Sequence, residues 1–333
     1  MKKGELEVSD DFNIWGWVHS AGAILLVATF IGFLGDFYWV FDLFSQFRIQ
    51  YFFISLLLLL VVSVMRRRDQ KLIMKYLFVF VVNLVFLWPL FEGKPSSEIS
   101  GKGPYRALLI NLNSGNIRKD LVRKYVLNES ADFVTLLEVT ESWQSYLRGV
   151  NDVYPYMKFL AREDNFGLAV LSKFPIVNEE IRYLGEASKP TLRLGLDVDG
   201  KTLQLVVAHA FPPFGGKGTE FRDTQLRLLS DVGKNNDPTL LMADLNIVPW
   251  SSKFKKLLAN SEMTDSSAGY GLQTTWPSFT SVMGVPIDHV LLSREIRLLD
   301  RKIGKYVGSD HLPVIVEFMI DSSLKNKVKN TSQ

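Results

Sequence analysis

The chain has 333 residues, of which 47% are hydrophobic, with 38 Lys and Arg against 35 Asp and Glu. From Glu92 to the C-terminus there are 30 basic and 28 acidic residues, so this part carries a net charge of only +2, which argues against a strongly basic nucleic-acid-binding surface. The absence of cysteine excludes disulfides, thiolate metal sites and cysteine nucleophiles.

The N-terminal part holds three apolar segments long enough to cross a bilayer. Spanning takes about 20 apolar residues, and the segments cover residues 15–35, 49–65 and 72–91. Tryptophans 15, 17, 39 and 88 lie near the predicted ends, where interfacial aromatic residues are enriched. Because two more spans follow the first, a cleaved signal peptide is not expected. His19, inside the first span, is interpreted as a packing or interfacial residue.

The loop between the second and third spans sets the expected orientation. Its sequence, RRRDQK over residues 66–71, is short and strongly basic. The positive-inside rule places such a loop in the cytoplasm. Counting helices then puts residues 1–14 in the cytoplasm as well and everything after Phe91 on the outer side. The sequence therefore predicts a multi-pass membrane protein with an extracytoplasmic C-terminal domain.

The C-terminal part has the pattern of an α/β domain. Residues 92–103 have the composition of a linker, residues 104–320 form the expected domain, and residues 321–333 are expected to be a disordered tail. Short apolar runs predict buried strands at 107–112, 133–137, 168–171, 203–208, 239–243, 288–292 and 314–319. Helical spacing predicts helices over 117–128 and 219–232, the second with Thr219 as its N-cap.

Polar residues suited to catalysis cluster at the ends of these predicted strands. Any one of them alone would suit a turn, a cap or a buried hydrogen bond. Together they are more informative, because the three histidines after Phe91 all lie in strand-end motifs. His289 lies on the opposite face of an extended strand from Asp288 and is interpreted as structural. The candidates are Asn111, Glu138, His209, Asp244, Asn246, Asp288, Asp310 and His311.

The order of these motifs resembles the endonuclease/exonuclease/phosphatase superfamily over about residues 104–320. The matching elements are Asn after the first strand, a strand-borne Glu, FGLAVLSKFP, a strand-end His, Asp-x-Asn, Ile-Asp-His and Ser-Asp-His-x-Pro. Ala243 departs from the Gly that usually precedes Asp-x-Asn. With its three spans and the variants NLNSGN, ADLNIVPWS and FRDTQL, the chain looks like a bacterial subgroup. The resemblance implies a four-layer α-β-β-α sandwich preceded by three transmembrane helices in a bacterial plasma (inner) membrane.

The resemblance also implies a metal-dependent phosphoester hydrolase. Asn111 and Glu138 would bind Mg²⁺ or Mn²⁺, with Asp310 as a further candidate ligand, since these ions prefer hard oxygen donors. Asp244 would align or deprotonate the attacking water. Asn246 would bind a phosphate oxygen.

Two histidines complete the implied catalytic set. Asp288 would fix the tautomer of His311 by accepting its N–H, a common role for a carboxylate in an acid–base pair. His209 would stabilise the phosphoryl group or act as the acid. The sequence leaves open which group is the base and which is the acid.

The substrate is less constrained than the chemistry. A phosphodiester or a phosphomonoester is expected, carried either by nucleic acid or by a lipid head group, the latter favoured by the predicted membrane anchor. The small basic cluster Lys253, Lys255 and Lys256 is interpreted as a solvated helix face, and residues 211–218 are a candidate rim loop. A non-catalytic binding domain at the cell surface is the alternative from another class. No protein partner is predicted.

Overall fold

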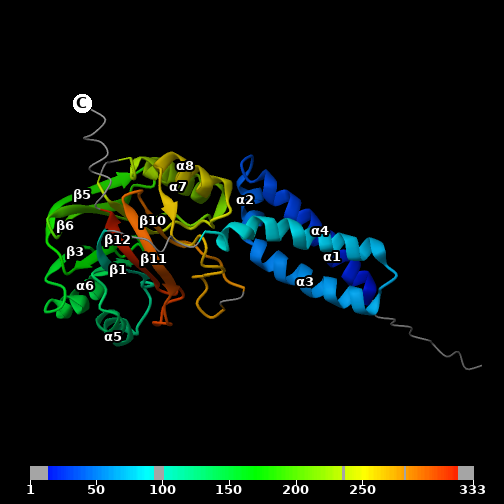
Figure 1. Ribbon diagram of the computed structural model, residues 1–333, viewed down its shortest axis with the longest axis horizontal. Coiled ribbons are helices and arrows are strands. Elements are labelled where there is room, and N and C mark those ends of the chain that lie inside the picture. The colour runs from blue at the N-terminus through cyan, green and yellow to red at the C-terminus, as the bar shows by residue number, and fades with distance from the viewer. Residues whose placement is uncertain (1–13, 94–100, 235–236, 281–282, 322–333) are drawn as a thin grey trace, which may run out of the picture.

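The computed structural model describes residues 14–93, 101–234, 237–280 and 283–321. Most of the expected cytoplasmic segment, most of the expected linker and nearly all of the expected tail therefore lie outside the described residues. Figure 1 shows an elongated molecule in which a helical bundle adjoins one end of a larger domain built around β-strands.

The bundle confirms the three predicted apolar helices. Each is long and apolar enough to cross a membrane, judged by length and composition. The start of the first helix and the basic loop lie at the same end, since the guanidinium of Arg66 lies 4.3 Å from the centre of the Trp15 ring. The helices are α1 (Ile14–Ile31) with η1 (Gly32–Leu34), α3 (Arg48–Met65), and α4 (Gln70–Leu87) with η2 (Trp88–Leu90).

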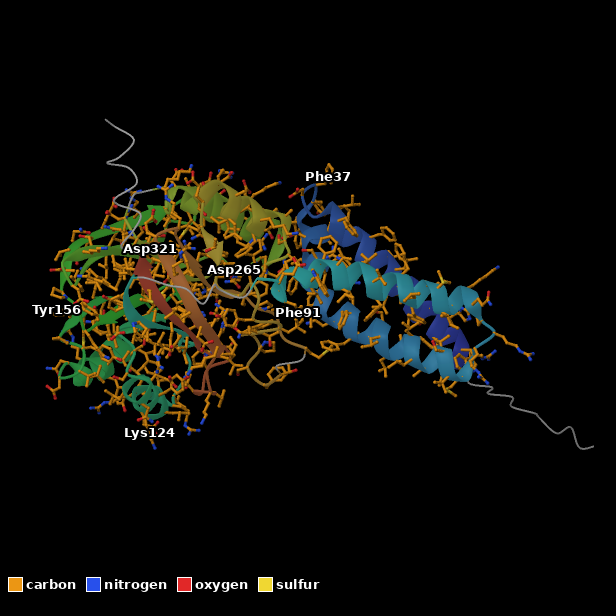
Figure 2. The ribbon with its side chains drawn as sticks, viewed as in Figure 1. Phe37, Phe91, Lys124, Tyr156, Asp265 and Asp321 are labelled. Carbon is orange, nitrogen blue, oxygen red and sulfur yellow. The ribbon has the colours of Figure 1, made fainter. Side chains whose placement is uncertain are left out.

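A short helix that was not predicted, α2 (Trp39–Gln46), lies between the first two spans. It is at the end of the bundle nearest the C-terminal domain (Figure 1). Phe37 and Phe91, labelled in Figure 2, are exposed at this same end. Exposed aromatic residues at the ends of apolar helices are typical of a membrane–water interface.

The C-terminal domain contains two six-stranded sheets. The first has the order β11-β12-β1-β2-β4-β3, and the second has the order β5-β6-β7-β8-β10-β9. In each sheet one neighbouring pair is parallel, β1 with β2 and β7 with β8, and the other pairs are antiparallel. The strands are β1 (Gly101–Asn111), β2 (Phe133–Leu137), β3 (Tyr156–Leu160), β4 (Leu168–Ser172), β5 (Ile176–Leu184), β6 (Lys189–Val198), β7 (Lys201–His209), β8 (Thr239–Asp244), β9 (Thr264–Asp265), β10 (Asp288–Leu292), β11 (Ile296–Ile303) and β12 (Val314–Asp321).

Alternation along the strands builds the four layers. Leu109 and Met242 lie in the core between the sheets, whereas Leu108 and Leu241, one residue away, face helices on the outer sides. Because successive side chains point to opposite faces, each central strand must be apolar on both. The fold is therefore the expected α-β-β-α sandwich. Its helices are α5 (Lys119–Glu129), α6 (Glu141–Leu147), η3 (Arg148–Val150), α7 (Gly215–Leu228), η4 (Leu229–Asp231) and α8 (Ser252–Ser261).

All seven predicted strands are present, but some predicted boundaries are wrong. Strand β1 begins at Gly101, so the last three residues of the expected linker belong to the sheet. Helix α7 begins at Gly215, and Thr219 lies inside it, with its hydroxyl donating to the Gly215 carbonyl oxygen. Thr219 is therefore not an N-cap. A mid-helix hydroxyl commonly bonds to the carbonyl four residues earlier, and this is what it does here.

Candidate active site

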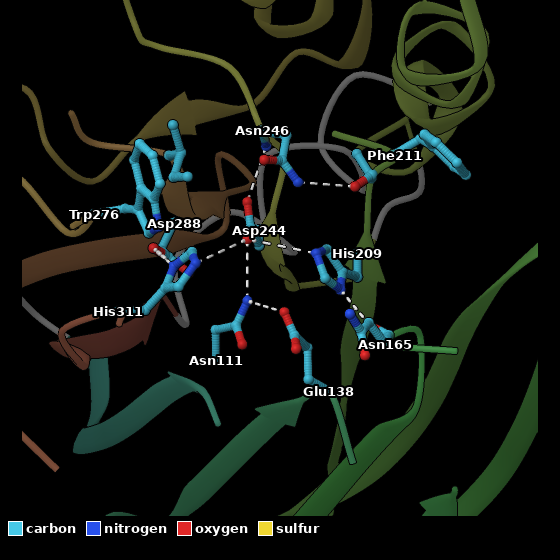
Figure 3. A network of polar contacts seen from close by, with 12 residues as sticks. Asn111, Glu138, Asn165, His209, Phe211, Asp244, Asn246, Trp276, Asp288 and His311 are labelled. Carbon is cyan, nitrogen blue, oxygen red and sulfur yellow. Dashed lines mark hydrogen bonds and ion pairs between the residues drawn. The ribbon is translucent and has the colours of Figure 1, made fainter. Parts of the chain in front are cut away.

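Strand pairing brings most of the predicted polar residues together. Asn111 ends β1 and is in register with Leu137, so it lies beside Glu138, which directly follows β2. In the other sheet His209 and Asp288 are each in register with Asp244. The two sheets thus bring these side chains together between their strand ends, and Figure 3 shows them converging.

Asp244 is the centre of this network. Its Oδ2 atom accepts a hydrogen bond from Asn111 Nδ2 at 3.1 Å. The same oxygen lies 3.5 Å from His209 Nε2 and 3.8 Å from His311 Nε2. Asn111 Nδ2 also donates to Glu138 Oε1 at 3.2 Å. One buried carboxylate therefore contacts or adjoins three other candidate residues.

The loop that carries His311 is fixed to the first strand. Ser309 Oγ donates to the Asn111 carbonyl oxygen at 2.7 Å and accepts from the backbone N–H of His311 at 3.0 Å. The His311 ring is buried, and its Nδ1 lies 2.8 Å from Asp288 Oδ2. This contact directs Nε2 of the imidazole toward Asp244. The pairing of Asp288 with His311 is the one that the family resemblance implies.

The surroundings of the two buried aspartates shift their pKa values in opposite directions. Burial raises the pKa of Asp244, and the neighbouring Asp288 adds to the effect, to about 6. Burial also acts to raise the pKa of Asp288, but the charge and hydrogen bond of His311 outweigh it and lower that pKa below its usual value. Burial alone would lower the pKa of His311, but Asp288 and then Asp244 overcome it and raise that pKa to about 10. At neutral pH the pair is therefore an imidazolium and a carboxylate.

The Asp-x-Asn turn is held in a conformation that few residue types favour. Asn246 has a φ of +50°, in the left-handed region that Asn tolerates better than most residues. Its backbone N–H donates to Asp244 Oδ1 at 2.9 Å, and its Nδ2 donates to the Ala210 carbonyl oxygen at 3.0 Å. An asparagine amide has two donors, and the second hydrogen of this one has no acceptor among the described residues.

The second histidine of the site has a defined tautomer. His209 Nδ1 lies 2.9 Å from the Asn165 carbonyl oxygen, which can only accept, so this nitrogen carries the hydrogen. Nε2 then faces Asp244. The His209 ring centre is 5.0 Å from that of Phe166, and Lys189 Nζ lies 4.1 Å from the centre of the Phe166 ring. No site residue was predicted in residues 166–175, although their sequence, FGLAVLSKFP, was one of the family motifs.

The residues around Glu138 suit a hard divalent cation. Glu138 has a φ of +59°, a strained conformation for a non-glycine residue and one that often marks a functional site. Its Oε2 accepts from the Ser114 N–H at 3.0 Å, while Oε1 faces Asn111. The carboxylates of Glu138 and Asp244 both bond the Asn111 amide, so a cation here would offset two like charges that are close together.

The amide of Asn111 must rotate before it can serve as a ligand. In this structure its Oδ1 accepts from the backbone N–H of Asn113 at 3.1 Å, and its amino group faces the two carboxylates. A metal role needs the amide oxygen on the carboxylate side. A second grouping of metal-ligating atoms, on Asp244, Asp288 and His311, lies within 4.8 Å. Within this grouping Asp288 and His311 already pair directly with each other.

Two other predicted residues lie apart from this network. The exposed Asp310 carboxylate accepts from Asn113 Nδ2 at 2.8 Å and from Trp276 Nε1 at 3.1 Å, at the rim of the site. His289 packs on the far side of the sheet, with its Nε2 2.8 Å from the Ile247 carbonyl oxygen. His289 is therefore part of the scaffold. Trp276 is a rim residue that the sequence analysis did not single out.

The basic cluster on α8 has partners that its sequence did not reveal. Lys253 Nζ lies 2.6 Å from an Asp223 carboxylate oxygen, and Lys256 Nζ lies 2.9 Å from one of Asp36. Lys255 Nζ lies 5.3 Å from the centre of the Phe86 ring in α4. Lys255 and Lys256 are nevertheless exposed, as the interpretation as a solvated helix face expects, and they lie beside the helical bundle.

Comparison with known proteins places this architecture. The family described as Endonuclease/Exonuclease/phosphatase family matches residues 108–311. No curated protein matches the chain.

Three solved structures illustrate the similarity of fold. An endonuclease/exonuclease/phosphatase from Bacteroides vulgatus is 18% identical with a TM-score of 0.55, over 66% of this chain and 100% of its own. D. rerio TDP2 in complex with a single-strand DNA product is 17% identical with a TM-score of 0.54, over 65% and 99%. The human Nocturnin catalytic domain with a bound sulfate anion is 17% identical with a TM-score of 0.51, over 65% and 93%. At such identities the likeness concerns the fold.

Proposed function

The chain belongs to the endonuclease/exonuclease/phosphatase family, and we propose that it is a membrane-anchored, divalent-metal-dependent phosphoester hydrolase. The observation that carries this proposal is the buried network around Asp244, in which acidic, amide and imidazole groups from both sheets converge. A binding domain without catalysis would have no need for two carboxylates and two histidines held so close together. Taking these groups out of water costs stability, so their concentration in one place is more typical of a functional site than of a scaffold.

Charge neutralisation is the first part of the proposed mechanism. Mg²⁺ or Mn²⁺ held by Glu138 and Asn111 would offset the negative charge of the phosphoryl oxygens. The free amide hydrogen of Asn246 is placed to bind one of these oxygens, across the Asp-x-Asn turn from Asp244. We place Asp310 at the rim of the site and do not assign it to the metal, because its carboxylate is bonded to Asn113 and Trp276.

Proton transfer is the second part. Asp244, whose pKa is raised to about 6, is the acidic group best matched to take a proton from water near neutral pH. His311 is protonated at that pH and can stabilise the phosphoryl group or supply a proton to the leaving oxygen. Asp288 fixes the orientation of His311, and His209 faces the same reaction space from the opposite side.

The side of the membrane follows from the basic loop. Residues 66–71 lie at the end of the bundle that is away from the domain (Figure 1). If the positive-inside rule holds for this loop, the bundle places the domain on the extracytoplasmic side. The proposed substrate pool is therefore outside the cytoplasm.

A specific observation favours lipid head groups as the substrate class over nucleic acid. Phe214 and Phe279 are 83% and 86% exposed, in two loops that adjoin the site. The first of these loops leads into α7, whose first turn contacts α2, since a Cβ at Gly216 would lie 3.2 Å from Trp39 Nε1. The other is tied to α3 by a 2.6 Å hydrogen bond from Gln50 Nε2 to the Met283 carbonyl oxygen.

These contacts place both loops at the level of the interfacial aromatic residues of the bundle. Exposed Phe side chains at that level would lie in the head-group region of a bilayer. The expected substrate is therefore a phosphoester carried by a membrane lipid, and nucleic acid is the alternative.

The test uses the full chain reconstituted in phospholipid vesicles. We expect Mg²⁺-dependent release of the head group from the vesicle lipid, together with slower hydrolysis of a soluble aryl phosphodiester. Cleavage of DNA or RNA without any action on lipid would reject the lipid assignment but keep the hydrolase. No hydrolysis of lipid, nucleic acid, aryl phosphodiester or aryl phosphomonoester would reject the proposed function itself.

A further inference from the structure

The short helix α2 presents a buried acidic residue to the C-terminal domain. Asp42 is only 2% exposed, although α2 joins two apolar spans. Its Oδ2 lies 2.6 Å from Arg222 Nη2 in α7, 180 positions later in the chain. The Arg222 side chain is completely buried. A buried ion pair of this kind is strongly destabilising when one partner is removed.

The same arginine reaches the active site. Arg222 Nη1 donates to the carbonyl oxygen of Asn246 at 3.4 Å, a long hydrogen bond to the residue that we place on the phosphate. A guanidinium is rigid and planar, so a contact that holds one of its nitrogens restricts the positions of the others. A third contact, to Asp223 Oδ1 at 2.8 Å, is secured by the pairing of Asp223 with Lys253. One side chain thus connects a membrane helix with the Asp-x-Asn turn.

Apolar packing connects the same parts. Val248 and Trp250, just after Asn246, share a core with the start of α3 and the end of α4, and so does Ile287, the residue before Asp288. Trp250 Nε1 also donates to the Ser45 carbonyl oxygen of α2 at 2.7 Å. Both segments that carry the site's aspartates are therefore packed against the bundle.

We propose that the membrane bundle forms a structural part of the active site, and that Asp42 and Arg222 are positioning residues for Asn246. Asp42 holds the Arg222 guanidinium, and Arg222 in turn holds the carbonyl of the strained Asp-x-Asn turn. This inference rests on the proposed function for its consequence in catalysis. Its structural part, the order of the turn, can be measured without any activity.

The test compares two charge removals at the same interface in full-length protein. Asp42→Asn removes the pair that reaches Asn246. Asp36→Asn is the matched control, because Asp36 bonds Ser252 and Lys256 on the same domain but has no described contact with the turn. We expect Asp42→Asn to lower kcat for a soluble aryl phosphodiester at least about tenfold with little change in KM, since small misplacements of positioning groups are costly. Asp36→Asn should behave as the wild type.

Hydrogen exchange supplies the independent readout. The N–H groups of Leu245 and Asn246 are bonded to the Ile287 carbonyl oxygen and to Asp244 Oδ1. In Asp42→Asn the peptide that contains them should exchange faster than in the wild type and in Asp36→Asn. If the wild type hydrolyses nothing, the proposed function fails, and the exchange comparison still decides whether the bundle orders the turn.

A second variant covers the case in which Asp42→Asn does not fold. The double substitution D42L/R222M replaces both charged side chains with apolar ones. Replacing a buried ion pair in this way often leaves the stability of the protein unchanged. We expect wild-type thermal stability, lowered kcat and faster exchange in the turn. A folded D42L/R222M protein with wild-type kcat and wild-type exchange would overturn the inference, as would equal effects of Asp36→Asn.

Discussion

Replacing His311 tests the site more sharply than any other single change. His311→Ala removes the imidazole that lies 2.8 Å from Asp288 and 3.8 Å from Asp244. Loss of one acid–base or charge-stabilising group lowers the rate by about 10²–10⁴. The ring is buried, so its removal also leaves Asp288 without its partner, at a cost of about 3–5 kcal/mol in unfolding free energy.

These two effects can be separated with a second substitution. His311→Asn keeps a hydrogen-bond donor near the position of Nδ1, so the pairing with Asp288 and most of the stability should be retained. It cannot carry the imidazolium charge, so the loss in rate should remain. The assay is kcat for a soluble aryl phosphodiester, with thermal unfolding measured on the same preparation.

His289→Ala is the matched control in the same domain. Its ring is buried, with its centre 4.4 Å from that of Phe254, and bonds the Ile247 carbonyl oxygen. Its removal should cost about 1–3 kcal/mol for the hydrogen bond that is lost, with activity close to that of the wild type. Equal and mild losses of activity in His311→Asn and His289→Ala would refute the assignment of His311 to the site.

Three further predictions address charge, substrate and topology. Asp288→Asn removes the carboxylate that does most to raise the His311 pKa, so that pKa should fall although Asp244 still raises it, and the alkaline limit of activity should move down by at least about 1 pH unit; an unchanged pH–rate profile would contradict this. Replacing Phe214 and Phe279 together by Ser should lower activity on vesicle lipid and spare the soluble diester, whereas Tyr183→Ser, an exposed residue on β5, should change neither; equal loss on both substrates would count against lipid. A C-terminal reporter should be active only as an extracytoplasmic enzyme, and activity as a cytoplasmic enzyme would reverse the topology.

The central strands other than β6 were predictable because their sequences are apolar on both faces. Strands β2 and β10 have the predicted bounds, since each is buried along its whole length and ends at a polar residue of the site. Strands β3, β5, β6, β9 and β11 were not predicted. In β5, β6 and β11 charged residues interrupt the apolar pattern. A strand at the edge of a sheet needs to be apolar on one face at most.

Those residues of the candidate site that lie at strand ends could be predicted from the sequence. The pairing of Asp288 with His311 matches what the family resemblance implies, and strand register accounts for the approach of Asn111 to Glu138. The direction of a loop side chain was not predictable, as Asp310 shows. Next to His311 in the chain, it bonds the rim residue Trp276.

The contact between α2 and α7 could not be predicted from the sequence, for a different reason. Asp42 and Arg222 are far apart in the chain, and each alone is typical of an ordinary exposed helical residue. Only the docking of the bundle onto the domain buries them together.

The account's central claim is that Glu138 holds a divalent metal needed for phosphoester hydrolysis, and a metal titration tests it most directly. Full-length protein is treated with a chelator, and the hydrolysis rate of an aryl phosphodiester is followed as Mg²⁺ is returned, beside the variant Glu138→Gln. The variant keeps the size of the side chain and removes its charge, so it should need far more Mg²⁺ and reach a lower rate while unfolding at the wild-type temperature. Undiminished hydrolysis by chelated protein, or identical Mg²⁺ titrations of the two proteins, would contradict the account.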